Sequence, residues 1–440
     1  MDTVGRVSFR GRITRVRLLQ PLRHRDFALL TTGSVISLIG DGFFHVALAW
    51  QVYEISNVPT ALSFVGVAAT LPLVLFVLLG GVFSDRYDRR LLMVSADILR
   101  GVALAAMALL SISGTIELWH LAVLMAFVGI GDAFFNPAST AIMPDVVPEH
   151  ELPQANALTG ALRQMMVRMV GPALAGLVVA LVGPGAAFGV DALTFFVSAV
   201  AIFAIRTRPE LRAEIESGVR QTVHEIGEGF RYVRGQPWIW ATLLSAMLSL
   251  LVFFGPVQVL VPFLVKNRLM LGPESLGAIF AAGGIGSIVM AFAIGHFGLP
   301  RKRVTVMYVS WTLGVAGMAV YGLMTDLWQG LIAAAITAAL FELGQVIWTT
   351  MLQQRVPRTL LGRVSSLDWM VSIGLVPVSY ALTGPAAEVL GPGPTMVVAA
   401  LLGAVLMFVL LFVPGVRDPE RLVDPAVVPA DAARYSPGDS

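Results

Sequence analysis

The sequence contains no cysteine, which excludes disulfides, thiolate metal sites and cysteine nucleophiles. Charged residues are also scarce: they make up 13% of the chain, whereas an ordinary soluble domain has roughly 25%. Lysine occurs only at Lys266 and Lys302, so nearly all of the positive charge is arginine. With a formal net charge of only +2, nothing indicates a nucleic-acid partner.

Sequence signatures of catalysis are missing as well. There is no GxxxxGKS/T phosphate-binding loop, so the chain has no recognisable means of hydrolysing ATP. His150-Glu151 and His224-Glu225 each lack the second histidine of a zinc-binding HExxH helix, and the six histidines are scattered. We therefore expect no enzyme activity, no cofactor, and no catalytic or metal-binding residues.

Apolar residues are abundant, at 56% of the chain, and the mean hydropathy is +0.79. A soluble protein has too little interior to bury so much apolar surface, which predicts a chain dissolved largely in lipid. A membrane-spanning helix needs about 20 mostly apolar residues. Twelve stretches meet this requirement and predict an all-α membrane protein: 27–51, 60–83, 91–113, 117–141, 157–182, 186–205, 238–264, 274–298, 304–324, 328–352, 366–386 and 393–414.

The distribution of arginine and lysine predicts the orientation of these helices. With the N-terminus inside the cell, the inner segments hold nearly all of the basic residues, and the outer loops hold only Lys266 and Arg268. Moving the count by one helix would destroy this alternation, so it supports twelve spans and two cytoplasmic termini. The arginine- and alanine-rich composition is typical of a GC-rich bacterial genome, which indicates the cytoplasmic (inner) membrane of a bacterium.

The longest inner loop divides the predicted helices into six and six. The first 25 residues carry seven arginines and no apolar core, which indicates a retained tail and not a cleaved signal peptide. The expected organisation is a basic cytoplasmic tail at 1–26, a six-helix bundle at 27–205, a cytoplasmic linker with an amphipathic helix at 206–237, a second six-helix bundle at 238–414, and a disordered cytoplasmic tail at 415–440.

An internal repeat relates the two bundles. Four residues that follow the fourth span of the first half recur at a constant offset in the second half: Val147, Pro148, Leu152 and Leu158 as Val356, Pro357, Leu361 and Leu367. Two parallel six-helix repeats are how one large class of secondary transporters is built, with the pathway between the repeats. The sequence thus predicts a transporter whose single chain contains a complete pathway, and we expect a monomer.

A charged motif lies between the second and third spans: Gly81-Val-Phe-Ser-Asp85-Arg86-Tyr-Asp88-Arg89-Arg90. A small residue lets helix ends approach, and an acid beside several arginines can form a charge-assisted latch at the cytoplasmic face. The alternative is a positive-inside loop with counter-ions. The motif resembles the signature loop of the major facilitator superfamily, with Asp88 where that loop usually has glycine. Asp97 and Arg100, three residues apart on the third span, are assigned to the same latch region.

The resemblance extends to the branch with enterobactin exporters, macrolide-efflux proteins and multidrug exporters. It is carried by Asp132-Ala-Phe-Phe-Asn-Pro and Pro144-Asp-Val-Val-Pro, and by Gly171-Pro172-Ala-Leu-Ala-Gly176, which is similar to the antiporter motif of drug exporters. A Gly-Pro pair removes a backbone donor and lets helices pack closely. The alternative is an ordinary helix kink. The arginine that such antiporters often carry on the fourth helix is absent here.

Two polar stripes occur within the predicted spans, and each repeats at three- and four-residue spacing on one helix face: Ser34, Ser37, Asp41 and His45, and Glu342, Gln345, Thr349 and Gln353. Because ionisable groups in a bilayer are costly, such stripes should face a watery cavity between the halves. Burial disfavours the charged form of a carboxylate, which suits it to exchanging protons. We therefore expect Asp41, His45, Glu342 and Gln345 to serve proton coupling or substrate binding.

Asp132 and Arg168 lie at comparable depths on the fourth and fifth spans, and we expect them to form an intramembrane ion pair. Such a pair belongs either to the transport mechanism or to a structural bridge that only neutralises the cost of burial.

The resemblance implies an exporter of an amphipathic small molecule, such as a drug or a siderophore, that is driven by proton antiport and works by alternating access. Its expected partners are this substrate, protons and membrane lipid. One alternative is a proton-independent facilitator or flippase for a lysolipid or another lipid-like metabolite. A second alternative, from a different class, is a membrane-embedded enzyme or receptor.

Overall fold

The computed structural model describes residues 17–206 and 219–421, and within these ranges it contains helices and no strand. The remaining parts of the predicted tails and linker lie outside the described residues. Twelve of the described segments are long and apolar enough to cross a membrane, which confirms the predicted number. Several of these spans are broken into two consecutive helices, so the structure has more helices than spans.

The first half of the chain forms six spans. Its elements are η1 (Arg17–Arg23), α2 (Arg25–Ile55), α3 (Pro59–Arg86), α4 (Arg89–Ile112), α5 (Leu118–Ala141), α6 (Met143–Val146), η2 (Glu149–Glu151), α7 (Leu152–Met165), the π-helical turn η3 (Met166–Val170), α8 (Gly171–Val182) and α9 (Pro184–Phe203).

The second half begins with the linker helix and forms six further spans. Its elements are α10 (Val219–Arg234), α11 (Pro237–Asn267), α12 (Pro273–Phe297), α13 (Arg303–Gly317), α14 (Ala319–Leu323), α15 (Leu327–Arg355), α16 (Arg358–Gly374), α17 (Val376–Leu390), α18 (Pro392–Leu410) and α19 (Asp418–Arg421).

Local sequence explains why the last two spans of each half are separated in the same way. Gly183 and Gly391 have φ angles of 91° and 87°, a left-handed conformation that glycine adopts without a steric penalty. Each is followed by a proline at the first position of the next helix, where no backbone N–H is needed. The matching Gly-Pro junctions reflect the repeat that relates the two halves.

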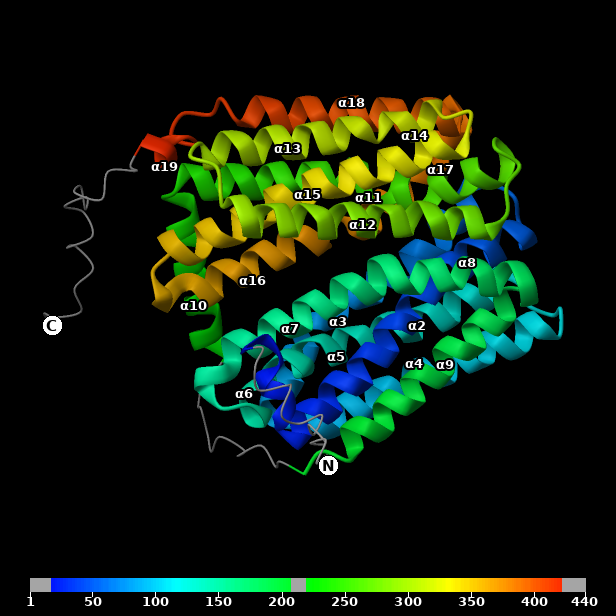
Figure 1. Ribbon diagram of the computed structural model, residues 1–440, viewed down its shortest axis with the longest axis horizontal. Coiled ribbons are helices and arrows are strands. Elements are labelled where there is room, and N and C mark those ends of the chain that lie inside the picture. Colours follow the sequence, from blue (N-terminus) through cyan, green and yellow to red (C-terminus); the bar gives the residue numbers. More distant parts are fainter. Residues whose placement is uncertain (1–16, 207–218, 422–440) are drawn as a thin grey trace, which may run out of the picture.

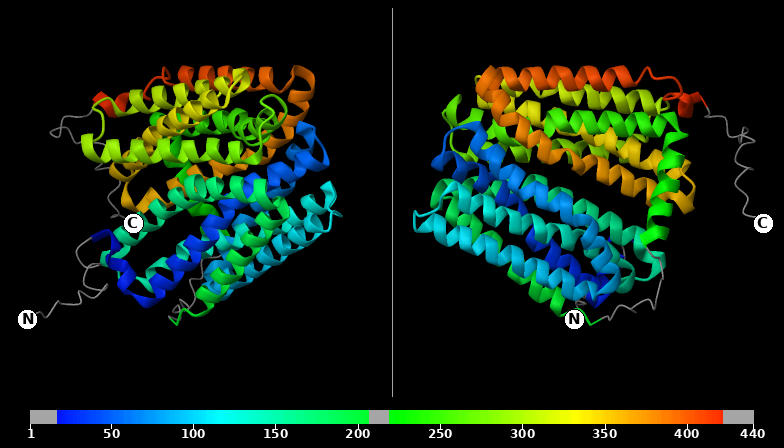
Figure 2. Two further views of the ribbon diagram at one scale, coloured as in Figure 1. Left: turned by 45° about the vertical axis from the view of Figure 1, so that its right-hand side comes forward. Right: turned by 180° about the vertical axis from the view of Figure 1, so that it is seen from behind.

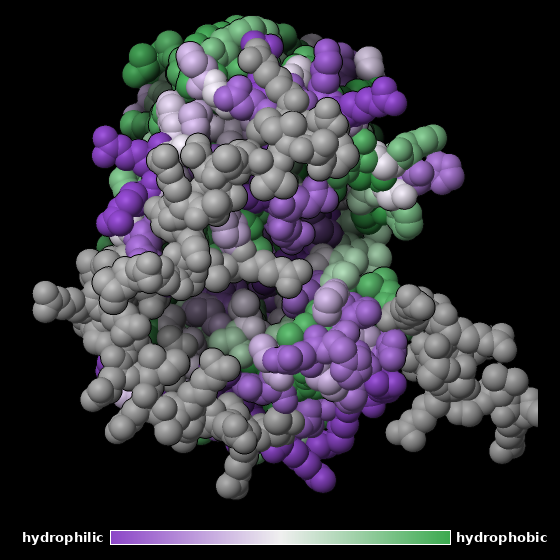
Figure 3. All heavy atoms as spheres, turned by 90° about the vertical axis from the view of Figure 1, so that its left-hand side faces the viewer, coloured by the Kyte–Doolittle hydropathy of each residue, from purple (hydrophilic) through white to green (hydrophobic). Residues whose placement is uncertain are grey.

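The two six-helix halves diverge toward one end of the molecule, as Figures 1 and 2 show. We call this the basic end, because η1, α10 and α19 lie there together with basic residues of the neighbouring loops and helix ends: Arg86, Arg89, Arg90, Arg206, Arg301, Lys302 and Arg303. Figure 3 looks onto the basic end, where hydrophilic side chains gather on both halves and the surface is hollowed between them.

The apolar core also differs between the two ends of the molecule. At the end opposite the basic end, one continuous cluster of buried residues runs through both halves, from Val52 and Phe188 in the first to Val259 and Met396 in the second. Near the basic end the core is divided: one cluster around Met93 belongs to the first half, and another belongs to the second half. The two halves are therefore packed together at one end, which we call the closed end, and separate at the other.

Candidate functional site

Polar contacts between the halves reinforce the closed end. The hydroxyl of Tyr53 donates to the carbonyl of Val259 at 2.6 Å, and Lys266 Nζ donates to the carbonyl of Tyr53 at 2.6 Å. Thr60 Oγ1 donates to Glu388 at 2.9 Å. Nearer to the basic end, the amide of Gln164 on α7 donates across the gap to Glu342 on α15 at 3.1 Å. The space between the halves is thus sealed at one end and bridged by few polar contacts toward the other.

The Gly-Pro motif of α8 lies at the contact between the halves. A Cβ added at Gly171 would lie 2.6 Å from the Cα of Gly42, so α8 packs closely on α2 of its own half. A Cβ added at Gly176 would lie 2.9 Å from the Cα of Glu274 on α12, in the opposite half. The glycines of this motif therefore permit close packing of α8 on both sides.

Pro172 and the π-helical turn before it expose backbone at the same contact. Because proline has no N–H, Pro172 cannot bond the carbonyl of Arg168 four residues earlier. That carbonyl faces Gly284 of α12, which has no side chain to exclude it. π-Helical turns are rare and often mark functional sites.

The polar stripe of α2 lies deep in its span and still reaches accessible space. Asp41 is partly exposed and His45 is exposed, while Ser37 is buried. The charge of Asp41 interacts with the charges of Arg100 and Arg163. Asp41 thus stands between the accessible space and a group of charges buried inside the first half.

That buried group is organised around Arg100 of α4. Its guanidinium forms ion pairs with Asp97 and, at 2.7 Å, with Asp132 of α5. It also lies over the rings of Phe135 and Phe195, 4.3 Å from each centroid. Arg100 is only 4% exposed, so two carboxylates and two aromatic faces replace its hydration shell.

Two sequence predictions are corrected here. The expected pair between Asp132 and Arg168 is wrong, because α4 lies against α5 and supplies Arg100 to Asp132 instead. The charge of Arg168 instead interacts with that of Glu342. Asp97 and Arg100 do not belong to the latch either: Arg100 lies 11 residues beyond the start of α4, roughly 16 Å into the span.

Asp191 of α9 is a member of this group that sequence reasoning missed. It is 1% exposed, and its Oδ2 atom has no hydrogen-bond partner, while Oδ1 accepts from Thr194 at 3.3 Å. Its charge interacts with that of Asp41, and its carboxyl packs directly on Gly40 of α2. The sequence contained a signal for this residue, because an aspartate inside an apolar span is costly and therefore indicates a functional role.

The charged loop after α3 makes contacts inside the first half. Asp88 caps α4 by accepting from the backbone N–H of Arg90 at 2.9 Å. Arg89 donates to Asp145 at 2.8 Å, and Arg90 donates to the carbonyl of Ile205 at 2.7 Å. These bonds connect the start of α4 to α6 and to Ile205, just after the end of α9.

The other residues of the loop motif in the predicted latch are Gly81, Asp85 and Arg86. The side chain of Asp85 lies outside the described part of the structure, and Arg86 is exposed. A Cβ added at Gly81 would meet nothing within 4 Å, so the expected close approach of helix ends at Gly81 is absent in this conformation. The neighbouring Gly80 instead packs on the backbone of Ala133.

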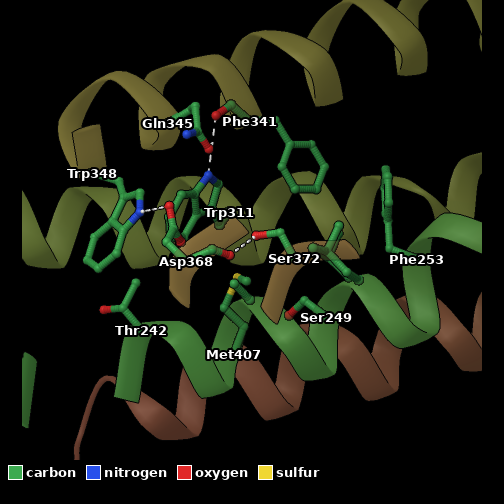
Figure 4. Close-up of a pocket in the computed structure, with 13 residues that line it drawn as sticks. Thr242, Ser249, Phe253, Trp311, Phe341, Gln345, Trp348, Asp368, Ser372 and Met407 are labelled. Atoms are coloured by element: carbon green, nitrogen blue, oxygen red, sulfur yellow. Dashed lines mark hydrogen bonds between the residues drawn. The ribbon is translucent and has the colours of Figure 1, made fainter. Parts of the chain in front are cut away.

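The second half presents its own polar and aromatic surface. Gln345 is exposed and Glu342 is half-buried, where it holds the cross-gap bond to Gln164. Beside Gln345 a pocket opens between α11, α13, α15, α16 and α18 (Figure 4). Its wall includes Asp368, a carboxylate that sequence reasoning missed and that accepts from Trp348 Nε1 at 3.2 Å.

The arrangement of two six-helix halves agrees with comparisons to known proteins. The family model described as "Transmembrane secretion effector", a branch of the major facilitator superfamily, matches residues 17–424. The chain belongs to this superfamily. Its members are membrane transporters, so this chain is a multi-pass membrane protein of a transporter family.

Curated relatives within the superfamily match most of the chain. It is 23% identical to macrolide efflux protein A of Streptococcus pyogenes over 369 residues. The match covers 83% of this chain and 90% of the relative. It is 28% identical to the multidrug efflux pump Tap of Mycolicibacterium fortuitum over 403 residues. This match covers 89% of this chain and 95% of the relative.

Solved structures of the superfamily have the same fold. A D-xylose–proton symporter aligns with a TM-score of 0.66 and 14% identity, over 86% of this chain and 96% of the symporter. A bacterial homologue of the human lysosomal transporter Spinster, inward-facing and unoccupied, aligns with a TM-score of 0.64 and 16% identity, over 89% of this chain and 97% of that one.

Proposed function

We propose that this chain exports an amphipathic small molecule, such as a drug or a siderophore, across the cytoplasmic membrane of a bacterium by proton antiport and alternating access. The relatives named as macrolide and multidrug efflux proteins support export as the direction. The divided core at the basic end and the continuous core at the closed end support alternating access between two such halves.

The basic end faces the cytoplasm in this proposal. Among the described residues, the loops and helix ends of the closed end carry only Lys266 and Arg268 as lysine or arginine, whereas those of the basic end carry many arginines. Basic loops are retained on the cytoplasmic side of membranes. The conformation described here is then inward-open, and substrate enters from the cytoplasm.

The observation that carries proton coupling is the excess of carboxylates over partners around Arg100. Asp97 and Asp132 both contact Arg100, which leaves Asp41 and Asp191 without an ion-pair partner within 4.0 Å among the described residues. Two neighbouring carboxylates in a medium of low dielectric are most stable when they share a proton. Asp41, which reaches the accessible space, exchanges that proton with water, and Asp191 shares it from inside the bundle.

The test uses purified protein in liposomes with an imposed pH gradient and a fluorescent amphipathic dye. Native protein should accumulate dye against its gradient only while protons flow the other way. Asp41→Asn and Asp191→Asn should abolish this accumulation, whereas Glu117→Gln, which alters an exposed carboxylate at the closed end, should not. Accumulation that persists after the proton gradient is collapsed would overturn proton coupling and favour the facilitator or flippase.

A further inference from the structure

The pocket beside Gln345 is not used by the proton mechanism, which lies in the other half. It has a volume of about 120 Å³ and is enclosed by helices of the second half alone. Its wall combines aromatic rings with the carboxylate of Asp368, as Figure 4 shows. The residues that line it include Ser249, Trp311, Phe341, Gln345, Trp348 and Asp368.

The aromatic walls are held in place before any ligand arrives. Trp311 Nε1 donates to the carbonyl of Phe341 at 3.2 Å, and Gly344 leaves the space that this indole occupies. Trp348 is fixed by its bond to Asp368 and by an edge-on contact with Trp238, whose ring centroid is 5.8 Å away. A pocket with fixed walls loses little conformational entropy when it binds.

The acidic side chain of the pocket has no cationic partner among the described residues. Among the described lining residues only Asp368 carries a formal charge, and no lysine, arginine or histidine of the described chain lies within 4.0 Å of its carboxylate oxygens. The hydroxyl of Ser249, which is 3% exposed, also lacks a partner. A carboxylate beside tryptophan and phenylalanine rings offers both of the attractions that a desolvated organic cation needs.

We infer that this pocket is a binding subsite for the cationic group of the exported molecule, a tertiary or quaternary ammonium on an apolar body. Asp368 supplies the counter-charge, Trp311, Phe341 and Trp348 supply the aromatic faces, and exposed Gln345 stands at the mouth toward the space between the halves. The inference rests on the proposed function, because it assigns part of the substrate of that same exporter.

The experiment measures equilibrium binding to the purified full-length protein by calorimetry, without any gradient. The probes are phenyltrimethylammonium and its neutral isostere tert-butylbenzene, which differ only in replacement of the charged nitrogen by carbon. Asp368→Asn should weaken binding of the cation about tenfold or more, which corresponds to the loss of a charge-assisted contact. It should change binding of the neutral isostere by less than about twofold, within the range expected of a polar substitution that keeps the shape.

Glu117→Gln is the matched control, because Glu117 also accepts from a tryptophan, Trp119 Nε1 at 2.9 Å, but lies exposed at the closed end. It should leave the binding of both probes unchanged. Ala246 of α11 also lines the pocket. If Asp368→Asn does not fold, Ala246→Phe fills the pocket without removing the carboxylate and should abolish binding of both probes. Cation binding that survives Ala246→Phe, or that Asp368→Asn weakens no more than it weakens the neutral isostere, would overturn the inference.

The two proposals fail in different ways. A protein that binds the cation through Asp368 but moves dye independently of protons retains this subsite and loses the antiport mechanism. A protein that couples dye to protons but shows no charge preference at this pocket retains the antiport mechanism and loses the subsite.

Discussion

Replacing Arg100 by methionine should strongly destabilise the first half of the protein. The change removes the partner of Asp97, whose side chain is fully buried, and of Asp132, whose side chain is 35% exposed. Breaking a buried ion pair by removing one member typically costs about 3–5 kcal/mol, because a charge is left without compensation. Asp97 accounts for most of this loss, since water can still screen Asp132. We therefore expect a loss of about 3 kcal/mol in the free energy of unfolding.

The measurement is unfolding by sodium dodecyl sulfate in mixed micelles, followed by tryptophan fluorescence. The double variant Arg100→Met with Asp97→Asn should recover most of the loss, because no unpaired charge then remains at the fully buried position. The double variant with Asp132→Asn should recover less. Arg86→Met, which alters an exposed arginine, serves as the control and should change stability by less than about 0.5 kcal/mol. Greater rescue by Asp132→Asn than by Asp97→Asn would refute this reasoning.

Three further predictions concern the membrane topology, the packing of α8 on α12, and the hydrogen bond from Tyr53 to Val259. Because the chain has no cysteine, single cysteines at Glu117 and Arg234 can be labelled cleanly; in intact cells a membrane-impermeant maleimide should modify only the one at Glu117, and modification of the other alone would invert the proposed topology. Gly176→Val should place a side chain against the backbone of α12, open the closed end and abolish transport, whereas Gly295→Ala, which meets nothing within 4 Å, should leave transport intact. Tyr53→Phe should remove the 2.6 Å bond to the carbonyl of Val259 and lower the free energy of unfolding by about 1 kcal/mol in the same detergent assay; an unchanged value would mean that this bond does not stabilise the seal.

The membrane-spanning architecture could be predicted from the sequence, because it depends on properties that run along the chain. Each span must be long and apolar enough to cross a bilayer, and each must satisfy its own backbone hydrogen bonds as a helix. Hydropathy alone therefore predicts twelve spans, and the structure confirms them. The repeat could also be predicted, because matching residues recur along the chain at a constant offset. The Gly183 and Gly391 junctions lie at equivalent points of the two halves.

The partners of the charged residues were decided only by the tertiary structure. Helical spacing indicates which residues share a face, as for Asp41 and His45, but it does not indicate which helix lies opposite that face. Asp132 therefore received the wrong partner, and Arg100 was assigned to the wrong region. Asp368 was missed because its role depends on indole rings from other helices that meet only in the folded bundle. Hydropathy is a property of single segments, whereas the compensation of a buried charge is a property of neighbours that the packing of helices brings together.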